Sequence, residues 1–221
     1  ANTPLLHWAQ LVVGTAAFLS IFVSTVYMLK VKNVKRMLAY SGIEHMGNVM
    51  LGVAAGGVGY YAAVLHIILH AFVKSSLFFQ FNQLYRVFQD KSIYHIGNYF
   101  KYNATGAMVL LFGFISATAM PPSGLFVSEF LIFKSIFDAG QIVLLIAVLL
   151  LLTLIIFAFG KNIFKILFIP AVGFDDSNVE KISPWESLSQ FLFLAFAVYL
   201  GLNPPAIFVQ LLKDSVSLLP M

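Results

Sequence analysis

Residues 120–130 read MPPSGLFVSEF and lie inside an otherwise apolar run that extends over residues 105–137. A proline has no N–H and its ring clashes with the preceding helical turn, so no continuous helix passes through Pro121 and Pro122. The run is therefore either a tight hairpin between two short membrane spans or one span with a break in its middle. Both interpretations place the chain in a membrane, which the composition supports.

The composition excludes a water-soluble protein. Hydrophobic residues make up 60% of the 221 residues and charged residues only 10%, against roughly 45–50% and 25% in soluble globular proteins. Cysteine is absent, which excludes iron–sulfur clusters, thiolate metal sites and disulfides held by this chain. The net charge of +4 does not indicate nucleic-acid binding, because the basic residues lie between apolar runs. The sequence predicts an integral membrane protein.

Apolar runs of about 20 residues, the length that crosses a bilayer, predict the helices. They lie at residues 5–29, 37–55, 60–84, 105–137, 141–160 and 188–211. The long polar segment at residues 161–186 is predicted to be a loop. We therefore expect an all-α fold, a polytopic membrane helix bundle with about six spans, in which residues 1–221 form a single membrane domain.

The positive charges decide between the two interpretations of residues 105–137, because cytoplasmic loops carry an excess of Lys and Arg. A single broken span places ten basic residues on one side and only Lys213 on the other, whereas a hairpin divides these residues eight to three. The ten are Lys30, Lys32, Lys35, Arg36, Arg86, Lys91, Lys101, Lys161, Lys165 and Lys181. We expect six crossings, a fourth span broken at Pro121 and Pro122, basic loops on the cytoplasmic (negative) side and both termini outside. A broken backbone at this depth is tolerated only inside protein or beside a hydrated cavity, so the break is a candidate functional site.

Ionisable residues inside the predicted spans indicate a polar pathway, because each is costly at bilayer depth. They are Glu44, His45, His66, His70, Lys74, Glu129 and Lys134. His66, His70 and Lys74 follow one another at intervals of four residues, so they form a slanted row about 12 Å long on one helix. Histidine titrates near neutral pH, and a row of this kind, bridged by water, is predicted to pass protons. The alternative is that the histidines hydrogen-bond neighbouring helices and Lys74 extends to the interface.

The other ionisable positions leave alternatives open. Glu44 is expected at the cytoplasmic mouth of the pathway, beside a cation inside the bundle, or in an interfacial ion pair. Glu129 is expected to be the terminal proton site, with Lys134 nearer the outer surface, or to form a structural salt bridge. No catalytic residue, metal site or cofactor-binding site is expected, since the spacing matches neither a catalytic triad nor a phosphate loop.

Three motifs occur in the order VKRMLAYS at residues 34–41, LHIILHAFVK at residues 65–74 and MPPSGLFVSEF at residues 120–130. Together they resemble the antiporter-like, proton-conducting membrane subunits of respiratory complex I, membrane-bound hydrogenases and Mrp cation/proton antiporters. The variant AYSGIEHMG at residues 39–47 is most similar to hydrogenase-4 F-type subunits of formate hydrogenlyase-like complexes. The motifs cover residues 30–138.

The resemblance implies roles for four residues. Lys74 matches the central lysine of the family, and His66 and His70 match the histidines that link it along a hydrated axis. Glu129 matches the Lys or Glu of the broken helix that ends the path toward the outer side. A complete member contains two inverted repeats, and this chain corresponds to the second, since the glutamate–lysine pair and the Pro-Phe-His-x-Trp stretch of the first are absent.

The resemblance also implies a function. The chain is expected to be the proton-translocating, non-redox subunit of a redox-driven pump, either NADH:quinone oxidoreductase-like or a hydrogenase, with electron transfer in other subunits. Its expected location is a bacterial or archaeal plasma membrane or an organellar inner membrane. Expected partners are lipids and other membrane subunits, including one that supplies the N-terminal repeat, and not nucleic acid.

Three alternative functions remain. The first is a Na⁺/H⁺ antiporter module, and the second is a half-subunit retained for assembly. The third is a haem-binding membrane anchor, in which His45 and either His66 or His70 would be the axial ligands.

Overall fold

A computed structural model describes residues 3–171, 173–174 and 179–219, so residues 172 and 175–178 of the predicted loop lie outside the described part. The described chain consists of helices and connections, with one isolated β-bridge between Asn33 and Ser92. The helices are α1 (Thr3–Leu29), α2 (Val34–Ala55), α3 (Val58–Phe88), α4 (Tyr99–Tyr102), α5 (Ala104–Ala117), α6 (Gly124–Asp138), α7 (Ile142–Phe168), the 3₁₀ helix η1 (Pro184–Ser187), α8 (Leu188–Leu202) and α9 (Ala206–Val216). The predicted all-α fold is confirmed.

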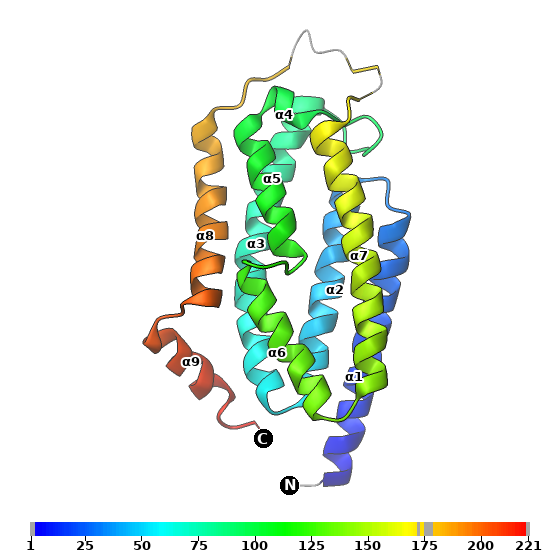
Figure 1. Cartoon of the computed structure of the whole chain (residues 1–221), viewed down its shortest axis with the longest axis vertical. Helices are drawn as coiled ribbons and strands as arrows, with labels where there is room; N and C mark the ends of the chain where they lie inside the picture. The colour runs from blue at the N-terminus through cyan, green and yellow to red at the C-terminus, as the bar shows by residue number, and fades with distance from the viewer. Residues whose placement is uncertain (1–2, 172, 175–178, 220–221) are drawn as a thin grey trace.

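Four helical segments of the described chain are long and apolar enough to cross a bilayer by themselves. They are Pro4–Leu29, Val58–Phe88, Ile142–Phe168 and Pro184–Leu202, with 19 to 31 residues and a mean hydropathy of 1.3 to 3.4. α2 has 22 residues, which is long enough for a span, but it carries more polar side chains. With α5 and α6 taken as one interrupted span, these helices correspond to the six predicted crossings, and Figure 1 shows them running along the long axis of the bundle.

α5 and α6 form the broken span. They have 14 and 15 residues, about 21 Å each, which is less than the roughly 30 Å of a hydrocarbon core. Figure 1 shows both helices running in the same direction, one below the other, whereas a hairpin would reverse the second. The Ser123 hydroxyl joins the two halves, because it donates to the carbonyl oxygen of Ser116 at 3.2 Å and accepts from the N–H of Leu125 at 3.1 Å.

α3 is the central helix. Half of its most apolar window is buried, against 28% for the corresponding windows of α1 and α7. α2, α5, α6 and α8 all pack against it. A polar side chain on the buried side of α3 therefore has protein around it rather than lipid, which is where ionisable residues are tolerated in a membrane.

Two glycines allow α8 to cross the start of α6 closely. A Cβ atom on Gly124 would overlap the carbonyl oxygen of Ala197, and a Cβ atom on Gly201 would overlap the Cα atom of Gly124. Any larger residue at either position would push α8 away from the broken span. This contact closes the bundle beside the break.

The boundaries of α7 and α8 correct two predictions. α7 continues to Phe168, so Lys161 and Lys165 lie on a helix and not in a loop. The last predicted span, residues 188–211, is also wrong at its C-terminal end, because α8 stops at Leu202 and α9 begins separately. Two consecutive prolines, at positions 204 and 205, explain this stop, since proline cannot continue the helical hydrogen bonds. Figure 1 shows α9 turned away from the axis of α8.

The loop before α8 is attached to the end of α3 by a cluster of ion pairs. The Nε atom of Arg86 donates to Glu180 at 2.9 Å, and a terminal nitrogen of Arg86 donates to Glu186. The hydrogen bond from Arg86 holds the pKa of the Glu180 carboxyl below its ordinary value. All three side chains are partly or fully exposed, so the cluster orients the loop and adds little stability.

Candidate functional site

All seven candidate residues lie on three neighbouring helices, and six of them are buried or half-buried. These six are Glu44 and His45 on α2, His66, His70 and Lys74 on α3, and Glu129 on α6. All of them are buried except His70, which is half-buried. Because α2, α3 and α6 pack against one another in pairs, these side chains face a common centre. We call these six residues the buried cluster.

The three histidines form a compact group. The ring centroid of His45 lies 5.2 Å from that of His66 and 4.9 Å from that of His70, and the His66 and His70 centroids are 6.3 Å apart. The Nε2 atom of His70 is buried and has no hydrogen-bond partner within the described chain, although buried polar atoms nearly always have one. The row on α3 is therefore joined by a histidine from α2, so the predicted pathway would cross between helices.

Hydrogen-bond partners fix which imidazole nitrogens carry protons. His45 Nε2 lies 2.9 Å from the carbonyl oxygen of Ala117, and a carbonyl can only accept, so this nitrogen is protonated. The other nitrogen of a neutral imidazole is an acceptor, so His45 Nδ1 accepts from His66 Nε2, 3.1 Å away. His66 Nδ1 in turn accepts from the Ser128 hydroxyl, 3.0 Å away. We call these three side chains the histidine chain.

One added proton reverses the two hydrogen bonds within the histidine chain, whereas His45 Nε2 continues to donate to Ala117. With both nitrogens of His45 protonated, Nδ1 donates to His66 Nε2, and His66 Nδ1 donates to Ser128. The Ser128 hydroxyl then donates to the carbonyl oxygen of Leu125, 3.0 Å away. Every donor in the histidine chain has an acceptor with or without the extra proton, because a backbone carbonyl accepts at each end. A chain of hydrogen bonds that conducts protons requires two such states, in both of which the donors and acceptors are paired.

Glu44 and Glu129 share one amide group. Asn48 Nδ2 donates to Glu44 Oε1 at 2.7 Å and to Glu129 Oε1 at 2.6 Å. A pair of carboxylate oxygens, one from each residue, lies within 4.8 Å, where two negative charges repel by about 3.5 kcal/mol at an effective dielectric constant of about 20. A proton or another cation bound at this pair removes the repulsion.

Glu44 also connects the carboxylate pair to the histidine chain. Its Oε2 atom lies 3.7 Å from His45 Nε2, and its side chain is almost completely buried. The structure therefore places Glu44 inside the bundle.

The two lysines of the predicted pathway have different surroundings. Lys74 is 6% exposed, and its Nζ atom donates to the carbonyl oxygen of Leu38 at 2.9 Å. The Lys134 side chain is 53% exposed and forms an ion pair with Asp138, one turn later on α6. The structure brings Lys74 into the buried cluster and leaves Lys134 outside it.

Asn48 and Ser128 were not predicted from the sequence. Each had a weak signal, since Asn48 lies four residues after Glu44 on α2 and Ser128 directly precedes Glu129. Neither residue ionises, so a search for charged side chains inside spans overlooks both. The carbonyl groups of Ala117 and Leu125 have no signal in the sequence at all.

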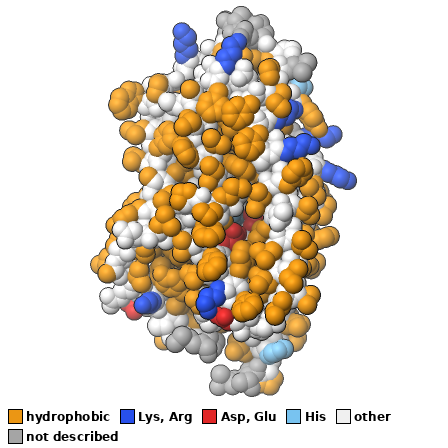
Figure 2. All heavy atoms as spheres, viewed as in Figure 1, with side chains coloured by type: hydrophobic (Ala, Val, Ile, Leu, Met, Phe, Trp, Pro, Cys, Tyr) orange, Lys and Arg blue, Asp and Glu red, His pale blue; other side chains and the backbone are white. Residues whose placement is uncertain are grey.

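A cavity of about 200 Å³ opens beside the carboxylate pair and is lined by Glu44, His45 and Glu129, with aromatic and aliphatic side chains of α6 and α7 around them. Figure 2 shows acidic side chains at the bottom of an opening midway along an otherwise apolar face. The same three residues bring ligand atoms within 4.8 Å of one another. They could therefore hold a cation, although no metal site was expected from the sequence.

The histidine geometry does not fit a haem. A haem between His45 and His66 would separate the two rings by the iron and its macrocycle, but their nitrogens lie within hydrogen-bond distance. His66 and His70 lie one turn apart on the same helix and cannot bind opposite faces of one haem. The geometry therefore disfavours a haem-binding anchor.

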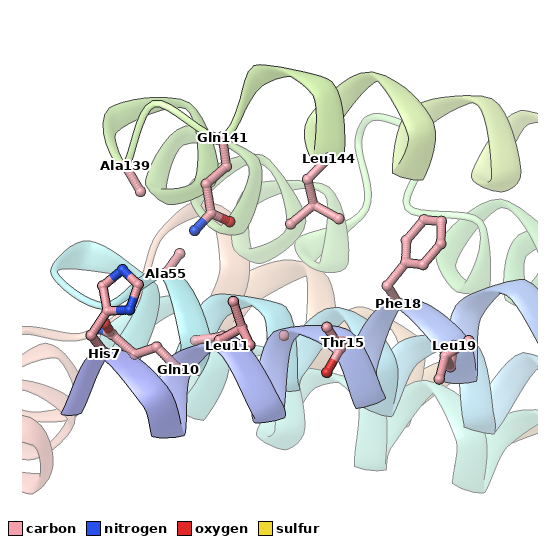
Figure 3. A pocket seen from close by; sticks show the side chains of 12 residues that line it. His7, Gln10, Leu11, Thr15, Phe18, Leu19, Ala55, Ala139, Gln141 and Leu144 are labelled. Carbon is pink, nitrogen blue, oxygen red and sulfur yellow. The ribbon is translucent and has the colours of Figure 1, made fainter. Parts of the chain in front are cut away.

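A wider cavity of about 700 Å³ lies between α1, the end of α2 and the start of α7. Figure 3 shows His7 and Gln141 at one end of it, with Phe18 and Leu144 farther along between the two helices. None of the residues that line it belongs to the buried cluster. The two features are separate.

Replacing Ser128 with alanine is expected to slow proton transfer through the buried cluster severalfold, because His66 Nδ1 loses its partner. The matched control is Ser135→Ala, since Ser135 donates to the carbonyl oxygen three residues earlier on the same helix, as Ser128 does, but has no hydrogen bond to a histidine of the described residues. Proton uptake by membrane vesicles measures both variants. Equal rates in the two variants would show that Ser128 only caps its own helical turn.

Comparison with known proteins agrees with the motifs. The family model described as NADH:quinone oxidoreductase/Mrp antiporter, TM, matches residues 2–155. The chain is 30% identical over 119 residues to the hydrogenase-4 component F homolog of Methylacidiphilum infernorum. This alignment covers 53% of this chain and 25% of that protein. The chain is also 28% identical over 224 aligned positions to NADH-quinone oxidoreductase subunit N 2 of Symbiobacterium thermophilum. That alignment covers 96% of this chain and 41% of that protein.

A solved structure has the same fold. A chain in the structure of the Mrp complex from Dietzia sp. DQ12-45-1b superposes with a TM-score of 0.83 at 15% identity, over 94% of this chain and 47% of that one. The chain thus spans less than half the length of each of these relatives. The predicted resemblance is confirmed, because the family model covers well over half of the sequence. The chain is an integral membrane protein and belongs to the NADH:quinone oxidoreductase/Mrp antiporter transmembrane family.

Proposed function

We propose that this chain is a proton-translocating membrane subunit of a redox-driven, multi-subunit pump, and that the buried cluster carries the protons. The histidine chain is the observation that carries the proposal. It joins α2, α3 and α6 through two contacts of 3.0 and 3.1 Å and ends on carbonyl oxygens. Such a chain takes up and releases a proton without leaving a buried polar atom unpaired, and each unpaired buried polar atom would cost about 1–3 kcal/mol.

Protons enter the cluster at Lys74 and leave it at Glu129 in this proposal. His70 lies one helical turn before Lys74 on α3, and its ring lies 4.9 Å from that of His45. From His45 the proton moves along the histidine chain, or to Glu44 and through the carboxylate pair. Electron transfer in other subunits changes the charge around Lys74 and so drives the proton toward Glu129, which stays in contact with the cavity between α6 and α7.

We infer that residues 1–221 form one membrane domain, the second repeat of an antiporter-like subunit with its core at residues 30–138. The coverage of the relatives supports this inference, since the chain matches 47% of the Mrp chain and 41% of subunit N 2. The basic loops lie on the cytoplasmic side of an energy-transducing membrane, as the positive-charge bias favours.

The proposal is tested with His66→Gln in vesicles that contain the assembled complex. Glutamine keeps a hydrogen-bonding side chain but does not titrate, so the number of protons moved per electron is expected to fall at least about tenfold. His95→Gln is the matched control, because His95 is exposed and pairs with Asp90 outside the bundle. The proton-to-electron ratio of the control should equal that of the wild type. An unchanged ratio in His66→Gln would contradict the proposal.

A Na⁺/H⁺ antiporter module is the second candidate function. Glu44, His45 and Glu129 bring their ligand atoms within 4.8 Å of one another, and carboxylate oxygens suit hard cations. Vesicles without an electron donor distinguish the two functions. A sodium gradient should move protons in them if the chain is an antiporter module, and should have no effect if it works only within a redox-driven pump.

A further inference from the structure

A separate cavity lies at the basic end of the bundle, between the end of α1, the connection after α3 and the last turns of α7. Its volume is about 450 Å³, and four lysines line it: Lys30, Lys32, Lys161 and Lys165. Figure 2 shows Lys and Arg side chains gathered along the upper right edge of the molecule, above a broad apolar surface. None of the buried cluster lines this cavity, so it has no part in the proposed proton pathway.

The ammonium groups around this cavity have no anionic partner within the described chain. No carboxylate of the described residues lies within 4.0 Å of Lys30, Lys32, Lys161 or Lys165. Lys165 instead lies over the ring of Tyr94, with Nζ 4.6 Å from the ring centroid. Four like charges around one hollow repel one another, and an anion bound between them would reverse the sign of that energy.

The depth of the cavity matches the headgroup region of a bilayer. α7 has 27 residues, about 40 Å of helix, and exceeds the roughly 30 Å hydrocarbon core by several residues. Lys161 and Lys165 lie in the last two turns of this helix, and Phe157, one turn below Lys161, is 64% exposed. Leu29 and Phe157 line the same cavity. The cavity therefore has cationic groups at one level and apolar side chains directly below them.

We propose that this cavity binds the phosphate of an anionic phospholipid. The phosphodiester lies among Lys30, Lys32 and Lys161, and an acyl chain lies against Phe157 and Leu29. Basic pockets between membrane helices on the cytoplasmic side are suited to such headgroups. The apolar side chains favour a lipid over free phosphate or an acidic peptide, because neither of these has a hydrocarbon part to place against them. This inference does not depend on the proposed proton function.

The test compares spin-labelled phosphatidylglycerol with spin-labelled phosphatidylcholine in vesicles that contain the chain. Electron spin resonance measures the fraction of each lipid that the protein immobilises. The wild type should immobilise a larger fraction of phosphatidylglycerol than of phosphatidylcholine. The double variant Lys32→Gln/Lys161→Gln should lower this preference for phosphatidylglycerol by about fivefold for each lysine removed, until the two lipids are immobilised equally. Lys32→Arg/Lys161→Arg should retain it. Lys134→Gln/Lys213→Gln, which removes two exposed lysines outside the cavity, is the matched control and should leave it unchanged.

Several outcomes would overturn the proposal. Equal immobilisation of both lipids by the wild type would show that the cavity does not select an anionic headgroup. The same preference in the Gln double variant and in the control pair would place the selective site elsewhere. Displacement of the labelled lipid by inorganic phosphate or polyglutamate, but not by unlabelled phosphatidylglycerol, would assign the cavity to a free anion or to an acidic peptide.

Discussion

Replacing Lys74 with alanine is expected to lower the number of protons moved per electron to less than about one tenth of the wild-type value. Lys74 is the only buried Lys or Arg among the described residues, so no other ammonium or guanidinium group can replace it inside the bundle. Electron transfer should continue if other subunits perform it, and the complex should remain assembled. Proton uptake by vesicles, electron transfer and native gel electrophoresis of the complex measure the three properties.

The assembly of this variant is expected to survive for an energetic reason. Losing the donor to Leu38 leaves that carbonyl without one hydrogen bond, at a cost of about 1–3 kcal/mol. Removing a buried ammonium group offsets this cost, because buried charges are themselves expensive. Lys74→Met, which keeps most of the side-chain volume, should assemble at least as well and pump as poorly.

Lys134→Ala is the matched control for Lys74→Ala. Both lysines lie within predicted spans, but Lys134 is half-exposed and paired with Asp138. We expect wild-type pumping in this control. Unchanged pumping in Lys74→Ala, or an equal loss in both variants, would remove Lys74 from the proposed pathway.

Helix positions could be predicted from the sequence wherever one physical rule acted alone. The apolar length of α3 predicted a span at residues 60–84, which lies within the observed helix. The two prolines predicted the break between α5 and α6, and the charge bias favoured a broken span over a hairpin. The same proline rule applies at Pro204 and Pro205, but apolar residues on both sides made the region resemble one span. α7 was predicted too short because Lys161 and Lys165 suggested a loop, whereas both lie on the helix.

The inward orientation of the buried cluster could also be predicted, because charged groups on the lipid side are too costly. The contacts between helices could not. Whether His45 meets His66 depends on the rotation and relative depth of α2 and α3, which the packing of the whole bundle sets. Asn48 and Ser128 gained their importance from those contacts. Spacing within one helix predicted a row, and the structure added the connections across helices.

Replacing Glu129 with glutamine is expected to block proton release at the end of the pathway, with at least about a tenfold loss of pumping. Glutamine has nearly the same shape, and its Oε1 atom can still accept from Asn48 Nδ2, which now donates at 2.6 Å. An amide does not take up and release a proton, so the chemistry is lost while the contact is kept. Vesicle proton uptake measures the loss, and Glu180→Gln, an exposed loop carboxylate, is the control.

Thermal unfolding is a second measurement for Glu129→Gln, and its expected result differs from the loss of pumping, because stability should not fall. Glu44 and Glu129 repel when both are ionised, and Glu129→Gln removes one of the two charges while keeping the shared hydrogen bond. Its melting temperature should therefore equal or exceed that of the wild type, even though pumping falls. Loss of pumping together with a lower melting temperature would indicate a damaged bundle. Normal pumping would show that the carboxylate pair only joins α2 to α6 through Asn48, and the exit of the proton would then have to lie elsewhere.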